Sequence, residues 1–288
     1  MPVKMSNKVS EAVKLPKVLN LNPRSIYNKV KEFETFVDEH DIDLVCVSES
    51  WERGNDKPAN ENKKLEDIIN IENMEIVSNV FQRCGTGGRP AIFVNKSKFV
   101  TENLTNTLIS IPWGVEIVWA LLTPKNVDSK SKIQKIVVAS FYCKPGSKKK
   151  KVLLDHIAQV YGLLSSKYKK GLHWIMCGDA NELKLDSILM LNSNLCQVVK
   201  DPTRLDPPKI LDPIITTMSS FYEKPQCLPP LGPDAKGAPS DHLMVVMKPI
   251  SSASTKLDRN FKEINKLQAL TQKRHAKNAS LAGKRKVE

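Results

Sequence analysis

The feature that most constrains the fold of this chain is a short apolar run, rich in β-branched residues, that recurs along its length. Nine runs of four to eight residues share this character: residues 18–22, 44–48, 75–80, 91–94, 115–122, 136–142, 174–177, 210–216 and 243–247. Runs of this length and composition predict β-strands. A chain with so many strands buries them in sheets, so the pattern argues against a helical bundle.

Helical periodicity appears between some of these runs. Apolar residues at positions 30, 33, 36 and 37 share one helical face, and we expect Ser25 or Asn28 to cap that helix. A second apolar face spans residues 152–164, and a shorter third helix is expected within residues 182–191. Many strands with few helices predict an α/β (α+β) sandwich.

Loop signals and the limits of the apolar pattern divide the chain. Residues 85–88 (GTGG) predict a hairpin loop, and five prolines within residues 224–239 predict a long surface loop. The apolar pattern begins at the first strand run and stops near Pro249. We therefore expect a flexible N-terminus over residues 1–17, one domain over residues 18–250, and a basic tail or linker over residues 251–288.

The balance of charge indicates the kind of partner. The chain carries 44 Lys and Arg against 31 Asp and Glu, a net charge of +13, and more than half of that excess falls within residues 251–288. Such an excess favours a polyanion, either a nucleic acid or an anionic membrane surface. No apolar stretch approaches the roughly 18 residues of a membrane helix, and the N-terminus lacks the apolar segment of a secretory signal. We expect a nuclear or cytoplasmic protein that is not secreted and does not enter a membrane.

Polar side chains gather where the predicted strands end. Asn22 closes the first run, Glu49 follows the second, and Tyr142 closes the sixth. Asp179 and Asn181 follow the seventh run, Asp212 interrupts the eighth, and the ninth is immediately preceded by Ser240, Asp241 and His242. Any one of them alone is an ordinary turn, cap or packing residue. Together, at the ends of strands that a rigid sheet holds in place, they suit metal-assisted hydrolysis of a phosphodiester.

The physical reason lies in the charge of the substrate. A phosphodiester is anionic and repels hydroxide, and a divalent cation held by carboxylate oxygens neutralises that charge. An Asp/Asn pair then orients and deprotonates a water, while a histidine held by a second aspartate donates a hydrogen bond to the transition state. The sequence contains no Cys/His cluster with zinc spacing, so Mg²⁺ is the expected ion, with Mn²⁺ as a substitute.

The order and spacing of these residues resemble the endonuclease/exonuclease/phosphatase superfamily. They resemble most the apurinic-like endonuclease domain of non-LTR (LINE-type) retrotransposons. Seven segments carry the resemblance, in the order of that family: residues 21–29 (LNPRSIYNK), 48–51 (SESW), 87–94 (GGRPAIFV), 141–145 (FYCKP), 177–181 (CGDAN), 202–212 (PTR followed by LD) and 240–242 (SDH). The resemblance spans residues 18–247. It implies a DNase I-like fold, a four-layer sandwich of two mixed β-sheets flanked by helices.

The resemblance also implies a metal site. Glu49 is the expected principal ligand, with Asn22 beside it and Asp241 near the ion. Asp179 is expected to activate or hold the nucleophilic water. How metal and base duties divide between Asp179 and Asp241 stays open at the level of sequence.

The other roles implied by the resemblance are catalytic or supporting. Tyr142 is expected to contact the scissile phosphate, and Asn181 to orient the water. Asp212 and His242 are expected to form an Asp–His pair. Supporting hydroxyl groups are expected from Thr203 and Ser240.

The chain departs from the pattern of the family at three places. Arg89-Pro90 replaces the usual Gly-Val, Pro213 stands inside a predicted strand, and Ala180 replaces a bulky apolar residue. Each of the two prolines removes a backbone donor from its strand and favours a bend or an edge position. None of these departures removes a catalytic group.

These observations lead to one principal hypothesis and two alternatives. The principal hypothesis is a Mg²⁺-dependent endonuclease that nicks double-stranded DNA and leaves a 3′-hydroxyl, as in target-site nicking by retrotransposons. It requires no obligate protein partner, and a monomer is expected. One alternative keeps the fold and changes the substrate to an abasic site or another phosphodiester. The other alternative is a nucleic-acid-binding protein that has lost catalysis.

Overall fold

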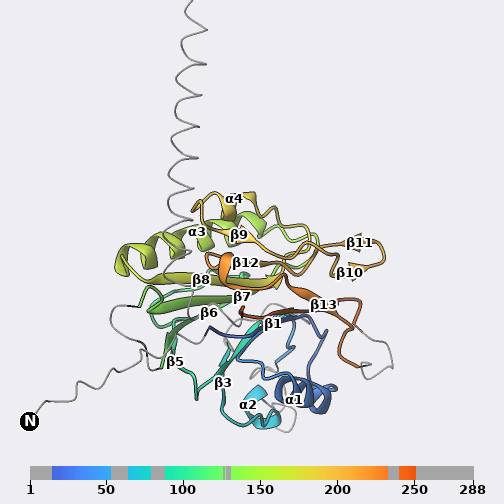
Figure 1. The fold of residues 1–288 in the computed structure, drawn as a ribbon. Helices are drawn as coiled ribbons and strands as arrows, with labels where there is room; N and C mark the ends of the chain where they lie inside the picture. Colours follow the sequence, from blue (N-terminus) through green and yellow to red (C-terminus); the bar gives the residue numbers. More distant parts are fainter. Residues whose placement is uncertain are drawn as a thin grey trace, which may run out of the picture. The chain divides into compact units, whose positions relative to one another are not determined.

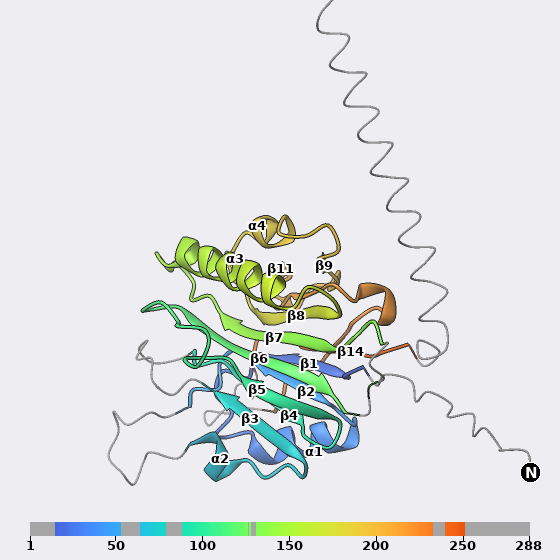
Figure 2. The same ribbon diagram turned by 90° about the vertical axis from the view of Figure 1, so that its left-hand side faces the viewer.

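Two six-stranded β-sheets lie face to face, and helices cover the outer face of each (Figures 1 and 2). The structure is a computed structural model that describes residues 15–52, 64–78, 88–125, 127, 131–232 and 240–250. The chain divides into two units, Met1–Pro249 and Ile250–Glu288, and all helices and strands of the described residues belong to the first. Among the described residues, no helix is long and apolar enough to cross a membrane.

The first sheet has the strand order β13-β14-β1-β2-β4-β3. Its strands are β13 (Gln226–Leu228), β14 (Met244–Met247), β1 (Val18–Leu21), β2 (Leu44–Val47), β4 (Ala91–Asn95) and β3 (Met74–Ser78). The pair β1–β2 is parallel and the others are antiparallel. The helices α1 (Val30–Glu39) and α2 (Leu65–Ile68) share a hydrophobic cluster with this sheet.

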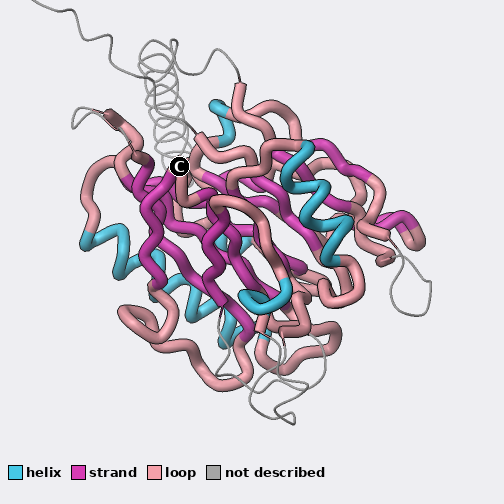
Figure 3. The backbone as a smooth tube through the Cα atoms, turned by 90° about the horizontal axis from the view of Figure 1, so that it is seen from below, coloured by secondary structure: helices cyan, strands magenta, loops and turns pink. Residues whose placement is uncertain are grey.

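The second sheet has the strand order β5-β6-β7-β8-β12-β9. Its strands are β5 (Phe99–Asn103), β6 (Glu116–Pro124), β7 (Lys135–Tyr142), β8 (Leu172–Asp179), β12 (Ile214–Thr216) and β9 (Cys196–Gln197). The pair β7–β8 is parallel. The helices α3 (Lys150–Lys167) and α4 (Asp186–Leu189) pack on it, and a short 3₁₀ helix spans Ser219–Phe221. A separate two-stranded hairpin joins β10 (Arg204–Leu205) to β11 (Pro208–Lys209). Figure 3 shows the backbone from below, with strands in magenta.

The two covered faces of each sheet explain why its strands appear in the sequence as unbroken apolar runs. Side chains point alternately to the two faces of a strand, and both faces of these sheets are covered. In β1, Leu19 and Leu21 pack with Phe33 and Val37 of α1, while Asn20 between them faces the other sheet. All four residues of β1 are buried. A strand covered on both sides therefore needs an apolar residue at almost every position.

Two buried polar side chains tie the sheets together near the same end. Asn20 Nδ2 donates to the carbonyl oxygens of Gly178 (3.3 Å) and Pro213 (3.1 Å) in the second sheet and its flanking loop. Ser140 Oγ of β7 donates to the carbonyl oxygen of Val47 of β2 (2.8 Å). These bonds fix how the C-terminal ends of β1, β2, β7 and β8 meet, because a buried polar group favours the one arrangement that satisfies it.

The predicted α/β sandwich of two mixed sheets flanked by helices is confirmed, and every predicted strand run contains a strand. Several details were wrong. Neither Ser25 nor Asn28 caps α1: its N-cap is Lys29, without a side-chain cap bond. Part of the loop predicted within residues 224–239 is the strand β13, and the third helix is only the short α4. The hairpin loop predicted at residues 85–88 lies, apart from Gly88, outside the described residues.

The two unusual prolines lie before strands, where a missing backbone donor costs little. Pro90 directly precedes β4, and Pro213 directly precedes β12. The strand predicted over residues 210–216 therefore begins only at Ile214. The departures from the family pattern leave both sheets continuous.

Candidate active site

The predicted site residues converge where strands from both sheets end. Asn22 and Glu49 lie just beyond the C-terminal ends of the parallel strands β1 and β2. Tyr142 and Asp179 are the last residues of the parallel strands β7 and β8, and they are direct partners in the register. The C-terminal ends of two parallel strand pairs thus meet at one edge of the sandwich.

A buried Asp–His pair stands at the centre of this edge. His242 Nδ1 lies 2.8 Å from Asp212 Oδ2, and its Nε2 lies 3.8 Å from Asp179 Oδ2. Asp212 and Asp179 are at most 1% exposed, and His242 is 6% exposed. Because Asp212 accepts at Nδ1, the imidazole presents Nε2 toward Asp179. The structure therefore brings together three residues that are at least 30 positions apart in the chain.

The surroundings set the protonation of this group. Burial by itself lowers the pKa of His242, but the hydrogen bond and charge of Asp212, with Asp179 and Asp241, raise it to about 9. Burial, and then the charge of Asp212, raise the pKa of Asp179 to about 8. The imidazole is therefore cationic at neutral pH, and the Asp179 carboxyl titrates close to neutrality.

Asn22 links the two acidic sides of the site. Its amide Nδ2 donates to Glu49 Oε1 and to Asp179 Oδ2, both at 2.9 Å, while its Oδ1 accepts the backbone N–H of Arg24 at 3.0 Å. Asn22 is fully buried and Glu49 is partly exposed. One amide group thus holds two carboxylates together that would otherwise repel each other.

Tyr142 and Asn181 flank Asp179. Burial, and then the charges of Glu49 and Asp179, raise the pKa of Tyr142 well above its usual value, so its hydroxyl stays a neutral donor. The backbone N–H of Asn181 donates to Asp179 Oδ1 at 3.0 Å, and its side-chain Nδ2 donates to the carbonyl oxygen of Cys143 at 3.1 Å. Asn181 keeps a positive φ of 45°, a conformation that asparagine tolerates better than most residues.

Thr203 and Ser240 hold the loops of the Asp–His pair. Thr203 Oγ1 donates to Asp212 Oδ2 at 2.7 Å and accepts the backbone N–H of Asp212 at 3.1 Å. Ser240 Oγ donates to the carbonyl oxygen of Asn22 at 2.8 Å and accepts the backbone N–H of His242 at 3.2 Å. Both hydroxyls are buried, so they orient the pair rather than face solvent.

Asp241 differs from the other predicted residues because it lies at the rim. Its side chain is 50% exposed and forms an ion pair with Arg24 at 3.5 Å, and its Oδ1 is 4.0 Å from His242 Nε2. An ion pair this exposed contributes little to stability and exchanges easily.

Sequence reasoning missed one acidic residue at this edge, Glu116. It begins β6 and is the direct register partner of Tyr142, which in turn pairs with Asp179. Burial, partly offset by a hydrogen bond from the backbone of Arg89, raises the pKa of Glu116 to about 7, and the nearby charge of Glu49 adds to the rise. The only signal in the sequence was a charged residue at the second position of the apolar run 115–122, which is also typical of an exposed strand end.

The donor chemistry of the edge fits a hard divalent cation. Glu49, Asp179, Asp212 and Glu116 crowd their carboxylates together, and some of them raise the pKa of their neighbours. A cation bound among them favours their ionised forms, and carboxylate oxygens are the ligands that Mg²⁺ and Mn²⁺ take. Among the described residues, Asp179, Asp212 and His242 offer ligand atoms within 4.8 Å of one another. Since Nδ1 of His242 is engaged by Asp212, this group fits an acid–base pair better than a ligand set.

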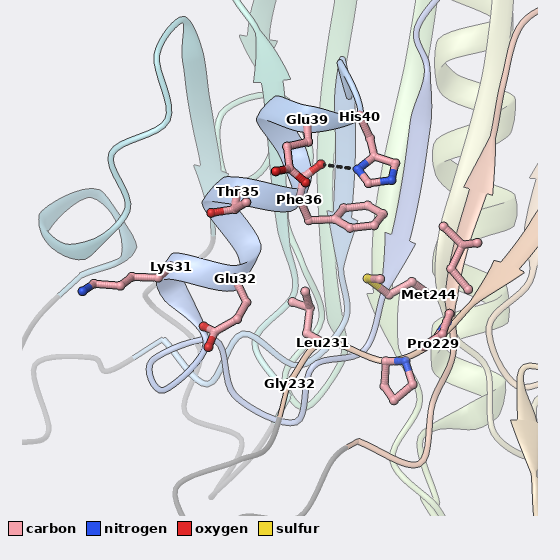
Figure 4. Close-up of a pocket in the computed structure, with 12 residues that line it drawn as sticks. Lys31, Glu32, Thr35, Phe36, Glu39, His40, Pro229, Leu231, Gly232 and Met244 are labelled. Atoms are coloured by element: carbon pink, nitrogen blue, oxygen red, sulfur yellow. Dashed lines mark hydrogen bonds between the residues drawn. The ribbon is translucent and has the colours of Figure 1, made fainter.

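A separate concavity lies along α1. It has a volume of about 590 Å³ and lies between that helix, residues 228–232 and Met244 (Figure 4). None of the predicted site residues lines it. We therefore place the chemistry at the strand ends, where titratable groups converge, and not in the cavity along α1.

Comparison with known proteins identifies the fold. No family model matches the sequence, and no curated protein matches it. Among solved structures, the endonuclease domain of TRAS1, a telomere-specific non-LTR retrotransposon, is 14% identical and superimposes with a TM-score of 0.56, covering 82% of this chain and 98% of that one. The 3′ phosphatase NExo from Neisseria, bound to a product DNA hairpin, is 13% identical with a TM-score of 0.54, covering 82% of this chain and 100% of that one.

An AP endonuclease from Leishmania major is similar in the same way, at 14% identity and a TM-score of 0.52, with 82% of this chain and 88% of that one covered. The names of these proteins describe enzymes that act on nucleic acids. At such low identity, the similarity establishes the architecture alone. This chain has the DNase I-like fold of the endonuclease/exonuclease/phosphatase superfamily.

Proposed function

We propose that this protein is a divalent-metal-dependent DNA endonuclease that hydrolyses one phosphodiester bond and leaves a 3′-hydroxyl. One observation carries the proposal most: His242, cationic at neutral pH, is held between Asp212 at 2.8 Å and Asp179 at 3.8 Å. A buried, fixed imidazolium beside a carboxyl that titrates near neutrality suits phosphodiester hydrolysis. The net charge of +13 supports DNA as the polyanion.

Each side chain has a role in this reaction. Asp179 accepts the proton of the attacking water through Oδ2, and Asn181 orients that water. The water oxygen attacks phosphorus, the bond from phosphorus to the 3′ oxygen breaks, and the departing 3′ oxygen takes up a proton from solvent, which produces the 3′-hydroxyl and a 5′-phosphate. Nε2 of His242 donates to a non-bridging phosphate oxygen, where charge accumulates in the transition state. Tyr142, kept neutral, donates a second hydrogen bond to the phosphate.

The metal ligands belong to the same proposal. Glu49 is the principal ligand of Mg²⁺ or Mn²⁺, with Asn22 beside it and Asp241 near the ion. When bound, the cation supplies neutralisation of the phosphate charge and Lewis-acid polarisation. Asp212, with Thr203, keeps the imidazole charged and correctly turned, and Ser240 fixes the loop that carries it.

The decisive experiment is nicking of supercoiled plasmid. We expect the purified protein to convert supercoiled to open-circular plasmid with Mg²⁺ or Mn²⁺ and to stop in EDTA, and a polymerase to extend the nick directly. Undiminished nicking in EDTA contradicts the metal role. A matched control is Asp155→Asn, which removes one exposed carboxylate of α3 and leaves the rate unchanged.

Parallel substrates separate this function from its alternatives. The same reaction is run with an oligonucleotide that carries one abasic site and with a phospholipid phosphodiester. Cleavage of the abasic strand alone assigns the first alternative. Binding of DNA without cleavage under every metal condition assigns the second, a protein that has lost catalysis. We further propose that the protein acts as a monomer on double-stranded DNA in the nucleus or cytoplasm, in a role like target-site nicking by retrotransposons.

A further inference from the structure

Glu116 lies in line with two residues of the proposed site. Across the second sheet, it pairs in register with Tyr142, and Tyr142 pairs with Asp179. Direct partners in a sheet present their side chains on the same face, so all three side chains lie on one face at one end of the sheet. Glu116 is partly buried there, close enough to Glu49 for their charges to interact.

The carboxylate of Glu116 anchors a turn of the first sheet. Its Oε2 accepts the backbone N–H of Arg89 at 2.8 Å. The preceding residue, Gly88, has φ of 71°, and a Cβ atom there would stand 1.7 Å from the same Oε2. Glycine adopts that φ without strain, and its missing Cβ lets the carboxylate of Glu116 lie directly against the backbone. The Gly88–Arg89 turn is therefore shaped around the carboxylate.

Backbone hydrogen bonds to Gly88 and Arg89 fix the segment that follows Glu49. The carbonyl oxygen of Gly88 accepts the backbone N–H of Trp51 at 3.2 Å, and that of Arg89 accepts the backbone N–H of Ser50 at 3.3 Å. Trp51 has a positive φ of 57°, which is rare for a bulky residue. A conformation of this kind persists only where its surroundings hold it.

Trp51 then reaches the proposed metal ligand. Its indole Nε1 donates to Glu49 Oε2 at 2.9 Å, while Asn22 holds Glu49 Oε1 at 2.9 Å. The two oxygens of Glu49 are therefore fixed by different donors. Trp51 is 41% exposed, so it is not placed by burial in the core.

We propose that Glu116, acting through the Gly88–Arg89 turn and Trp51, is a positioning residue that orients Glu49 for the divalent cation. The inference rests on the proposed function, because it takes Glu49 as a metal ligand. Partners behind a ligand fix its orientation, and their loss typically weakens metal binding by about 10- to 100-fold.

The test measures Mn²⁺ binding without DNA, by the electron paramagnetic resonance signal of free Mn²⁺. We expect Glu116→Ala and Trp51→Phe each to raise the dissociation constant by about tenfold. Glu116→Gln keeps an acceptor for the N–H of Arg89, so its affinity stays within about threefold of the wild type. The control is Glu102→Ala, which removes an exposed carboxylate from β5 and leaves binding unchanged.

A second readout separates positioning from general damage. In plasmid nicking, the Mg²⁺ concentration for half-maximal rate should rise in Glu116→Ala and Trp51→Phe, while the rate at saturating Mg²⁺ stays within about threefold. If Glu116→Ala does not fold, Trp51→Phe decides, since Trp51 is exposed and phenylalanine keeps an aromatic ring at that position while removing the indole N–H.

Three outcomes decide between the ideas. Wild-type Mn²⁺ affinity in both Trp51→Phe and Glu116→Ala overturns the inference and leaves the proposed function standing. An equal loss in Glu116→Gln and Glu116→Ala also overturns it, because a ligand or a bare charge then explains the effect. Unchanged Mn²⁺ binding in Glu49→Gln overturns the metal assignment of the proposed function itself.

Discussion

Two histidines of this fold are both buried, yet their surroundings move their pKa values in opposite directions. His242, at the strand ends, is 6% exposed, and the Asp212 carboxylate offsets the effect of burial and raises its pKa to about 9. His156, on α3, is 4% exposed, and burial alone lowers its pKa to about 4. Its Nε2 accepts a hydrogen bond from Trp119 Nε1 at 3.1 Å.

The comparison separates a packing histidine from a candidate catalytic one. His156 belongs to the layer in which α3 packs on the second sheet. A neutral imidazole is sufficient there, because it accepts one hydrogen bond, from the indole of Trp119. His242 stands among carboxylates that other polar groups hold in place. Burial is common to both, so the neighbouring charge and not the burial distinguishes the site.

The largest expected difference between His242 and His156 is the effect of their substitution on the rate of DNA nicking. His242→Ala and Asp179→Ala should each lower the nicking rate by at least about 10²–10⁴, the usual worth of a positioned acid or base. The double variant should lose far less than the product of the two losses, because both residues serve one transition state. The measurement is single-turnover nicking at saturating Mg²⁺.

His156→Gln is the matched control for the catalytic variants. Glutamine keeps an acceptor for Trp119, so the nicking rate should stay within about threefold of the wild type while thermal stability falls. A near-normal rate in folded His242→Ala contradicts the catalytic assignment. A loss in His156→Gln as large as that in His242→Ala contradicts the distinction between the two regions.

The same contrast shows what the sequence predicts. Asp212 and His242 are 30 positions apart, and both were predicted as site residues because each stands in a short segment with a recognisable composition. Glu116 was missed because its place beside Tyr142 depends on the register of β6 against β7, which no local pattern encodes.

Some strands of the fold were predicted from the sequence and others were missed, for a similar reason. Strands covered on both faces, such as β1 and β2, were predicted because nearly every residue in them is apolar. The strand β5 was missed because only Phe99 is buried in it, and β13 because prolines surround it in the sequence. Local periodicity detects a buried strand, but an edge strand is defined by its partner.

Stability of the metal-free protein at alkaline pH tests the surroundings of His242. Its pKa is raised from 6.5 to about 9, so the folded protein binds the proton more tightly than the unfolded chain. That stabilisation is fully present below pH 6.5 and is lost as the pH rises to about 9, a change of about 3 kcal/mol at roughly 1.4 kcal/mol per pKa unit. Urea unfolding in EDTA at pH 6.5 and 9 measures the total decrease in stability, to which Asp179, with its pKa raised to about 8, adds in the same direction.

Asp212→Asn sharpens this prediction because it keeps an acceptor for Nδ1 and removes the charge. We expect the stability of this variant to fall much less between pH 6.5 and 9 than that of the wild type. A wild-type decrease in Asp212→Asn means that the Asp212 charge is not what holds the proton on His242.

Stability at acid pH tests His156, with the opposite sign. Its pKa is lowered from 6.5 to about 4, so the unfolded chain binds the proton more tightly than the folded protein. Its contribution is present above pH 6.5 and is lost as the pH falls toward 4. We expect the acid decrease in stability to be shallower in His156→Gln than in the wild type. An identical decrease in both proteins would show that carboxylates alone cause it.

The smallest expected effect separates the chemistry of the strand ends from electrostatic attraction to DNA. Residues 251–288 carry +7 of the net charge of +13, and every proposed catalytic residue precedes them. We predict that a chain ending at Pro249 folds and nicks with an unchanged metal requirement, but binds DNA more weakly. Each lost phosphate contact removes about 0.9 from the slope of log affinity against log salt. Binding of both chains, measured from about 50 to 200 mM salt, decides the matter, because a linker that never contacts DNA leaves the slope unchanged.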